Sequence, residues 1–221
     1  ELRLQKYVST NSDKTQKVSS KKITRGNSTK KQVALTFDDG PSEITKDILA
    51  LLKKYNIKAT FFWQGKNLKA HQDIIHQALK DGHQIENHSW NHENGHDASN
   101  LDLWKNQVHK TNLEFQKYGI PKPKYYRPPF GAITNQQINF LFNKNIKTAM
   151  WSISTLDWKK SHNSEGKMFN KFKNELNKGA IVLLHDYDFG NPEAKLNDLE
   201  LMIKYGLSKD YKFVSFDEIL D

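Results

Sequence analysis

The sequence predicts an α/β fold in which about seven parallel strands alternate with helices. Short apolar runs recur through residues 33–221, and the segments between them carry apolar residues at helical spacing. Such alternation implies parallel strands joined by crossover helices. No fixed-period repeat or low-complexity block interrupts the pattern, so we expect residues 33–221 to form one domain. The alternation fits both a barrel and a doubly wound sheet.

The predicted elements follow one another as strand and helix along the chain. Ser42 can cap the first helix, in which Ile44, Ile48 and Leu52 repeat at helical spacing. The second helix stops before Gly82, a residue type common just past a helix end. Further helices are expected at 99–118, near 134–143, near 165–177 and near 196–205. The strand candidates are 33–37, 58–63, 83–88, 125–127, 146–153, 180–185 and 211–216.

Residues 1–32 carry most of the positive charge of the chain. They account for +7 of the net charge of +9, and they are rich in Ser, Thr and Lys. We predict a polar basic linker or tail here, with attraction to an anionic surface such as a wall polymer or lipid headgroups as the sharper hypothesis. Because the remaining residues are nearly neutral, we expect no nucleic-acid partner.

The chain contains no cysteine. Disulfides and thiolate ligands are therefore excluded, and any metal site must use histidine and carboxylate. No apolar run approaches the roughly 18 residues of a membrane helix. The chain begins at Glu1 rather than Met, so we expect an extracellular or cell-surface protein whose leader or anchor has been removed.

Polar side chains gather at the carboxyl ends of the predicted strands. In parallel α/β folds, active sites form at this end of the sheet. Any one of these residues could be an ordinary loop residue, but together they indicate an active site. They are Asp38 and Asp39 after the first strand, His88 and His92 at the third, Arg127 at the fourth, Asp157 after the fifth and His185 at the sixth.

The stretch HSWNH (88–92) holds two histidines four residues apart. One turn of helix would place both rings on one face, about 5–6 Å apart at Cβ, as two ligands of one metal require. A polar surface turn is the alternative. The stretch lacks the Glu of HExxH, which disfavours a zinc protease of that type. With one nearby carboxylate, the two imidazoles would form a three-ligand site that leaves a position for water, as in catalytic zinc sites.

The pair Asp38 and Asp39 can supply that carboxylate. Adjacent residues leaving a strand point in different directions, so one could bind metal while the other faces the substrate. A plain Asp-Asp-Gly turn is the alternative. Near them, His185 is a candidate general acid that Asp157 could orient, or else a core histidine. Arg127, in RPPFG, could pair with a carboxylate of the site.

Five motifs in this order resemble those of the NodB-type polysaccharide deacetylases, also called carbohydrate esterase family 4. They are TFDDGP (36–41), HSWNH (88–92), RPPFG (127–131), STLDW (154–158) and LLH (183–185). The resemblance spans about residues 33–221 and implies a distorted (β/α) barrel. It also implies a divalent metal, most often zinc with cobalt as an alternative, and removal of N-acetyl groups from N-acetylglucosamine-type glycans with release of acetate.

The resemblance further implies a role for each motif residue. Asp38 would be the catalytic base, and Arg127 would hold its carboxylate. His185 would be the general acid that protonates the departing amine, tuned by Asp157. The metal ligands would be Asp39, His88 and His92.

Three further residues would contact the substrate by the same resemblance. The backbone N–H of Phe130 would help to bind the oxyanion, and Trp158 and Leu183 would line the acetate pocket. Trp158 taken alone could equally be a core tryptophan or a flat wall against a sugar ring. Two positions depart from the family pattern, since Ser154 stands where many members have Asp and Phe130 where Tyr is frequent. These departures bear on substrate preference.

Three functions therefore compete. The first is an N-deacetylase acting on peptidoglycan, chitooligosaccharide or poly-N-acetylglucosamine. The second is an O-acetyl esterase with the same site, acting for example on acetylated xylan. The third is a non-catalytic glycan-binding module, which the presence of every implied catalytic group disfavours. In each case we expect a monomer.

Overall fold

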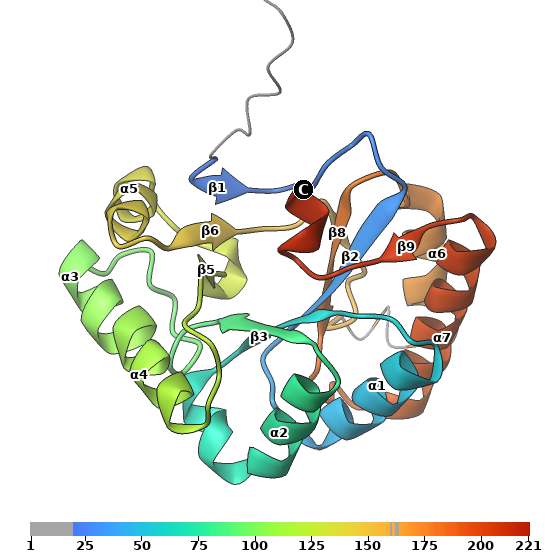
Figure 1. Cartoon of the computed structure of the whole chain (residues 1–221), viewed down its shortest axis with the longest axis horizontal. Coiled ribbons are helices and arrows are strands. Elements are labelled where there is room, and N and C mark those ends of the chain that lie inside the picture. Colours follow the sequence, from blue (N-terminus) through green and yellow to red (C-terminus); the bar gives the residue numbers. More distant parts are fainter. Residues whose placement is uncertain (1–19, 160, 162–163) are drawn as a thin grey trace, which may run out of the picture.

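A nine-stranded parallel sheet curls through the centre of the structure, a computed structural model that describes residues 20–159, 161 and 164–221. The strand order is β1-β6-β5-β4-β3-β2-β8-β7, and β9 pairs with the start of β2. Within the described residues no pairing joins β7 to β1, so the sheet is an open, distorted (β/α) barrel (Figure 1). The strands are β1 Lys22–Ile23, β2 Gln32–Asp38, β3 Thr60–Trp63, β4 Gln84–Asn87, β5 Tyr125–Tyr126, β6 Lys147–Ala149, β7 Ile153–Ser154, β8 Ala180–His185 and β9 Lys212–Phe213.

The helices lie around the outside of the curled sheet (Figure 1). The long helix predicted at 99–118 is present as α3, a π-helix and α4 in direct succession. The α-helices are α1 Glu43–Lys54, α2 Gln72–Lys80, α3 Asn100–Asp102, α4 Lys110–Lys117, α5 Asn135–Asn143, α6 Lys167–Glu175 and α7 Pro192–Ser208. Shorter turns are the π-helix Leu103–His109 and the 3-10 helices Gly65–Ala70, Pro129–Gly131 and Glu218–Leu220.

The alternation of side chains along β2 places the first catalytic candidate inside the barrel. Leu35 and Phe37 belong to the large core cluster that includes apolar residues of α1, α2, α6 and α7. Ala34 belongs instead to a smaller cluster with residues of β3, β5, β6 and the C-terminal turn. Because successive side chains of a strand point to opposite faces, Thr36 and Asp38 share the interior face with Ala34. Asp38 therefore stands at the carboxyl end of β2, facing inward.

The structure places residues 22–32 within the fold, which corrects the predicted boundary of the tail at residue 32. Lys22–Ile23 form β1, parallel to β6, and Ile23 is buried in the interior cluster. The N–H of Gly26 donates to the carbonyl of Gly179 at 2.9 Å. The segment is attached mainly through its backbone, so its polar composition concealed it. Residues 1–19 of the predicted tail lie outside the described residues.

The strand predicted at 146–153 is two strands, β6 and β7, separated by residues 150–152. The N–H of Met150 donates to Ile23 of β1, whereas the N–H of Ser152 donates to Ile181 of β8. The chain thus passes from one side of the barrel opening to the other within three residues. Apolar content alone could not show this change of partner.

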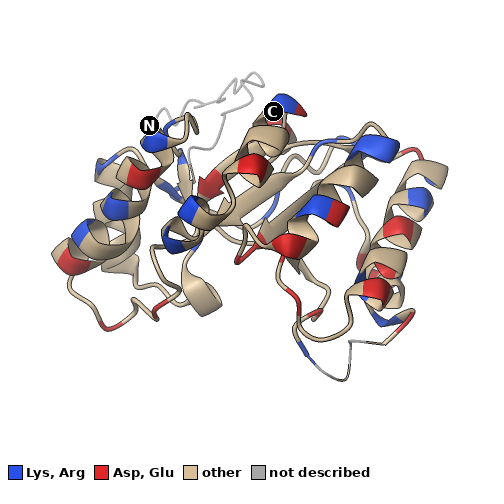
Figure 2. Cartoon of the chain, turned by 90° about the horizontal axis from the view of Figure 1, so that it is seen from below, with Lys and Arg blue, Asp and Glu red and all other residues tan. Residues whose placement is uncertain are grey.

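Charged side chains of both signs are interspersed over the outer helices (Figure 2). This distribution agrees with the concentration of the excess positive charge in residues 1–32. Of the helices in the described residues, none is both long enough and apolar enough to span a bilayer.

We expect β1 to contribute measurably to stability. A variant that starts at residue 32 should unfold at a lower urea concentration than one that starts at residue 20. Its free energy of unfolding should be smaller by about 2 kcal/mol or more. The reason is that it loses the buried Ile23 side chain and the backbone hydrogen bonds of β1. Equal urea midpoints for the two variants would show that residues 20–31 are a dispensable tail.

Candidate active site

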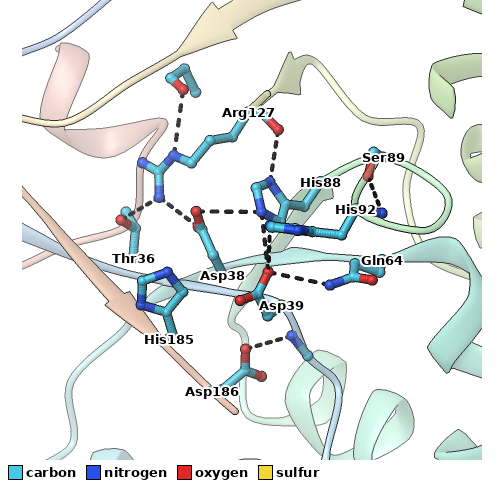
Figure 3. A network of polar contacts seen from close by, with 12 residues as sticks. Thr36, Asp38, Asp39, Gln64, His88, Ser89, His92, Arg127, His185 and Asp186 are labelled. Carbon is cyan, nitrogen blue, oxygen red and sulfur yellow. Dashed lines mark hydrogen bonds and ion pairs between the residues drawn. The ribbon is translucent and has the colours of Figure 1, made fainter. Parts of the chain in front are cut away.

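Asp38 is held by a buried arginine inside the barrel. Arg127 has no exposed surface, and its Nη1 donates to Asp38 Oδ1 at 2.8 Å and to Thr36 Oγ1 at 2.7 Å. Its Nη2 donates to the carbonyl of Met150 at 2.8 Å, and the guanidinium lies 4.0 Å from the ring centroid of Phe62. These contacts fix Oδ1 of Asp38, as Figure 3 shows, and leave Oδ2 directed toward His88, 3.7 Å from its Nε2.

Asp39 faces the two histidines of HSWNH (Figure 3). Its Oδ1 lies 3.3 Å from His88 Nε2 and 3.1 Å from His92 Nε2, and it accepts a hydrogen bond from Gln64 Nε2 at 3.2 Å. Burial alone would raise the pKa of Asp39, but the hydrogen bond and charge of His88 hold it well below its usual range. The structure therefore brings together the three predicted ligands.

The two histidines do not lie on a helix, which corrects the geometry predicted for HSWNH. His88 follows β4 directly, and the chain then turns through Ser89 and His92, both with positive φ (72° and 64°). The Ser89 hydroxyl accepts the N–H of His92, and Asn87 Oδ1 accepts the N–H of Ser89. This loop brings the ring centroids to 5.1 Å. The i, i+4 spacing identified the two histidines that meet, but a non-helical turn brings them together.

The donor set of Asp39, His88 and His92 fits a divalent metal. One ligand atom from each lies within 4.8 Å of the others. His88 Nδ1 donates its proton to the carbonyl of Arg127 at 2.7 Å, because a carbonyl can only accept, so the lone pair of a neutral ring is on Nε2. In the neutral ring this lone pair faces the Asp39 carboxylate at 3.3 Å, so both groups are placed to bind one cation. Two imidazoles and one carboxylate, with the outer nitrogen of His88 anchored, are typical of zinc sites.

His185 and Asp157 form a pair at the carboxyl end of β8. Nδ1 of His185 donates to Asp157 Oδ1 at 2.7 Å, and its backbone N–H donates to Oδ2 at 2.9 Å. Burial alone would lower the pKa of His185, but the charge of Asp157 and their hydrogen bond raise it to about 9. His185 is thus protonated at neutral pH, as a general acid must be.

The predicted substrate contacts lie around these groups. Phe130 has a positive φ of 60°, is 71% exposed and packs its ring 4.7 Å from that of His92. Trp158 is 46% exposed beside the buried Asp157, so it is not a core tryptophan. Leu183 is buried on β8, and its carbonyl accepts from Thr155, just before the 156–158 turn. That Trp158 and Leu183 share an acetate pocket stays a prediction.

Two residues that support the site escaped the sequence reasoning. Gln64, after β3, holds Asp39 Oδ1 and has no motif of its own. Asp186 is fully buried, and it accepts hydrogen bonds from the N–H of Gly40 at 2.9 Å, Thr45 Oγ1 at 2.8 Å and Trp63 Nε1 at 2.8 Å. It therefore fixes the turn after Asp39. Its place directly after His185, in LLHD, was the only available signal.

Comparison with known proteins agrees with this geometry. The family model for polysaccharide deacetylase matches residues 25–149. A peptidoglycan-N-acetylglucosamine deacetylase of Bacillus cereus is 34% identical over 187 residues, which cover 84% of this chain and 67% of that protein. The chain spans between 39% and 67% of the length of the first curated relatives that it matches.

Two solved structures share the fold over nearly the whole chain. The Bc1960 peptidoglycan N-acetylglucosamine deacetylase superposes with a TM-score of 0.84 at 30% identity, covering 91% of this chain and 93% of that one. BA3943, described as a CE4 family pseudoenzyme from Bacillus anthracis, superposes with a TM-score of 0.82 at 27% identity, covering 90% and 69%.

The fold and the site together place the chain in the class of NodB-type polysaccharide deacetylases, carbohydrate esterase family 4. The chain belongs to the polysaccharide deacetylase family.

The pairing of Asp157 with His185 predicts a pH effect of definite sign. Asp157→Asn keeps the shape but removes the charge that raises the pKa of His185. His185 should then lose its proton at lower pH, so the basic limb of the activity profile should move downward. Turnover should fall roughly 10²–10⁴-fold if general acid catalysis is largely lost.

Asp97→Asn is the matched control for this change. Asp97 also contacts a histidine, His96, at 2.8 Å, but its side chain is 97% exposed and it lies outside the site. Its pH–rate profile should match wild type. An Asp157→Asn enzyme with normal turnover and an unmoved basic limb would refute the pairing.

Proposed function

We propose that the protein hydrolyses the N-acetyl groups of N-acetylglucosamine residues in peptidoglycan. One observation supports this most directly, the convergence of Asp38, the cluster Asp39, His88 and His92, and the His185–Asp157 pair at the carboxyl ends of the strands. The name of the Bacillus cereus relative and that of the Bc1960 structure both point to peptidoglycan. Chitooligosaccharide and poly-N-acetylglucosamine contain the same acetamide and are the alternatives for the polymer.

A divalent metal held by Asp39, His88 and His92 would supply a Lewis acid that polarises the acetyl carbonyl and acidifies water. Zinc is the metal that we propose, with cobalt as a functional substitute, because the donor set has two imidazoles and one carboxylate.

The residues of the chain supply the proton transfers. Arg127 occupies Oδ1 of Asp38, so Oδ2 is the oxygen placed to accept a proton from the attacking water. The backbone N–H of Phe130 would donate to the oxyanion formed at the acetyl carbon. His185 Nε2 would then donate its proton to the departing nitrogen, while Nδ1 keeps its own proton in the hydrogen bond to Asp157. Water is consumed, and acetate and the free amine are released.

Several expectations about the setting of the enzyme stay predictions. An extracellular or cell-surface location fits an enzyme that acts on peptidoglycan. Contact of the basic residues 1–32 with an anionic wall, and a monomeric state, are likewise predictions. The departures at Ser154 and Phe130 bear on which glycan is preferred. Of the two, Phe130 is the more exposed, so we expect it to have the larger effect.

The substrate test compares acetate release from peptidoglycan fragments, chitooligosaccharides and O-acetylated xylan oligomers, with the products identified by mass spectrometry. We expect release from the N-acetylated substrates, and loss of that release in Asp38→Asn. Release from xylan alone would establish an O-acetyl esterase. Glycan binding without any release would establish a non-catalytic module such as the pseudoenzyme description of BA3943 implies.

Removal of the metal gives a second prediction. Treatment with a chelator should abolish acetate release, and zinc or cobalt should restore it. His88→Ala should lower the bound metal measured by elemental analysis, whereas His96→Ala, at an exposed histidine outside the cluster, should retain it. Full activity in protein shown to be free of metal would contradict the metal role.

A further inference from the structure

Lys195 is a buried ammonium group beside the catalytic pair, and the mechanism above does not use it. It lies in the first turns of α7 and is only 4% exposed. Buried lysines are rare unless they are paired. From the sequence it looks like an ordinary surface residue of an amphipathic helix, so no motif pointed to it.

The ammonium group of Lys195 has three oxygen atoms close to it. Nζ of Lys195 lies 2.9 Å from the carbonyl oxygen of His185, 2.8 Å from that of Tyr187 and 3.2 Å from Asp157 Oδ2. An ammonium group has three donors and no acceptor, so it donates hydrogen bonds to the two carbonyls and pairs through its charge with the carboxylate of Asp157. Lys195 thus ties α7 to the backbone on both sides of Asp186 and to the carboxylate that holds His185.

The two oxygens of Asp157 have separate partners. Oδ1 accepts from Nδ1 of His185, whereas Oδ2 accepts from the backbone N–H of His185 and faces Lys195. With Oδ2 held, the carboxylate cannot rotate away from the ring. Without Lys195, Oδ2 would keep the backbone N–H of His185 as its one partner among these groups.

We propose that Lys195 is a positioning residue for the general acid, which acts by holding Asp157 so that Nε2 of His185 points at the leaving nitrogen. This inference rests on the proposed role of His185. Lys195 also places a positive charge beside Asp157. The negative charge of Asp157 therefore interacts with both Lys195 and His185. The other charged groups that act on His185 are Asp38, Asp39 and His92.

This charge gives Lys195 an effect opposite in sign to that of Asp157. Without the ammonium group, the negative charge of Asp157 acts on His185 unopposed. This favours the protonated imidazolium and raises the pKa of His185. The basic limb of the pH–rate profile of Lys195→Met should therefore move to higher pH, whereas that of Asp157→Asn moves to lower pH. A purely structural role would not produce this opposition.

The test compares Lys195→Met with Lys204→Met, the same change on the same helix at a side chain that is 57% exposed. For Lys195→Met we expect kcat to fall roughly 10- to 100-fold through misplacement of the acid, with KM for a chitooligosaccharide nearly unchanged. Lys204→Met should behave as wild type. Wild-type kcat and an unmoved or lowered basic limb in folded Lys195→Met would overturn the proposal.

A double variant keeps the proposal testable if Lys195→Met fails to fold. Asp157→Asn with Lys195→Met removes both buried charges, which is better tolerated than leaving one unpaired. If Lys195 acts through Asp157, the double variant should be no slower than Asp157→Asn alone, because the two effects share one pathway. A further tenfold loss in the folded double variant would show that Lys195 acts elsewhere.

A nitrogen-15 NMR titration of the His185 ring separates this inference from the proposed function. The ring should lose its proton at higher pH in Lys195→Met than in wild type, whether or not a substrate is known. In a wild-type enzyme that deacetylates glycan, an unchanged titration would overturn the role of Lys195 alone. Failure of the wild type to release acetate from any substrate would instead count against the proposed function.

Discussion

One buried ion pair, Arg127 with Asp38, joins the barrel to its active site. The guanidinium has no exposed surface and binds side chains of β2, a carbonyl just past β6 and the aromatic face of Phe62 on β3. Breaking such a pair costs about 3–5 kcal/mol, because a buried charge is left without its partner. The same residue uses its own carbonyl to anchor His88. Arg127 therefore fixes one oxygen of Asp38, the proposed base, and one of the three proposed metal ligands at once.

Around this pair the loops adopt backbone conformations that residues other than glycine rarely adopt. Asp39, Ser89, His92 and Phe130 all have positive φ, between 60° and 81°. Non-glycine residues in sparsely populated backbone regions cost on the order of 1–3 kcal/mol each and persist where their surroundings enforce them. Here the enforcing contacts include Asp186 with the N–H of Gly40 and Ser89 with the N–H of His92. The core of the barrel thus supports a site whose loops would otherwise relax.

The sequence predicted the order of strands and helices because the apolar pattern is set locally. The alternation in β2 and the helical spacing in α1 each involve only neighbouring residues. The motifs also identified the residues that meet at the site. Local patterns failed where distant partners decide. Strand β1 depends on β6, and the break between β6 and β7 depends on β1 and β8. The HSWNH turn is formed by its own neighbours Asn87 and Ser89, and the four-residue spacing of the histidines did not distinguish it from a helix. The burial and contacts of Lys195 could not be predicted from the sequence, because the oxygen atoms around its ammonium group come together only in the folded chain.

The role of Arg127 in organising the site is tested most directly by the turnover number of Arg127→Lys at full metal occupancy. A lysine keeps the charge but cannot bridge Thr36, Asp38 and the Met150 carbonyl with the planar geometry of a guanidinium. We predict a folded enzyme with wild-type metal content whose kcat is lower by roughly 10- to 100-fold, since misplacing the base weakens proton transfer. A wild-type kcat in this variant would contradict the claim that the geometry of Arg127, beyond its charge, organises the site.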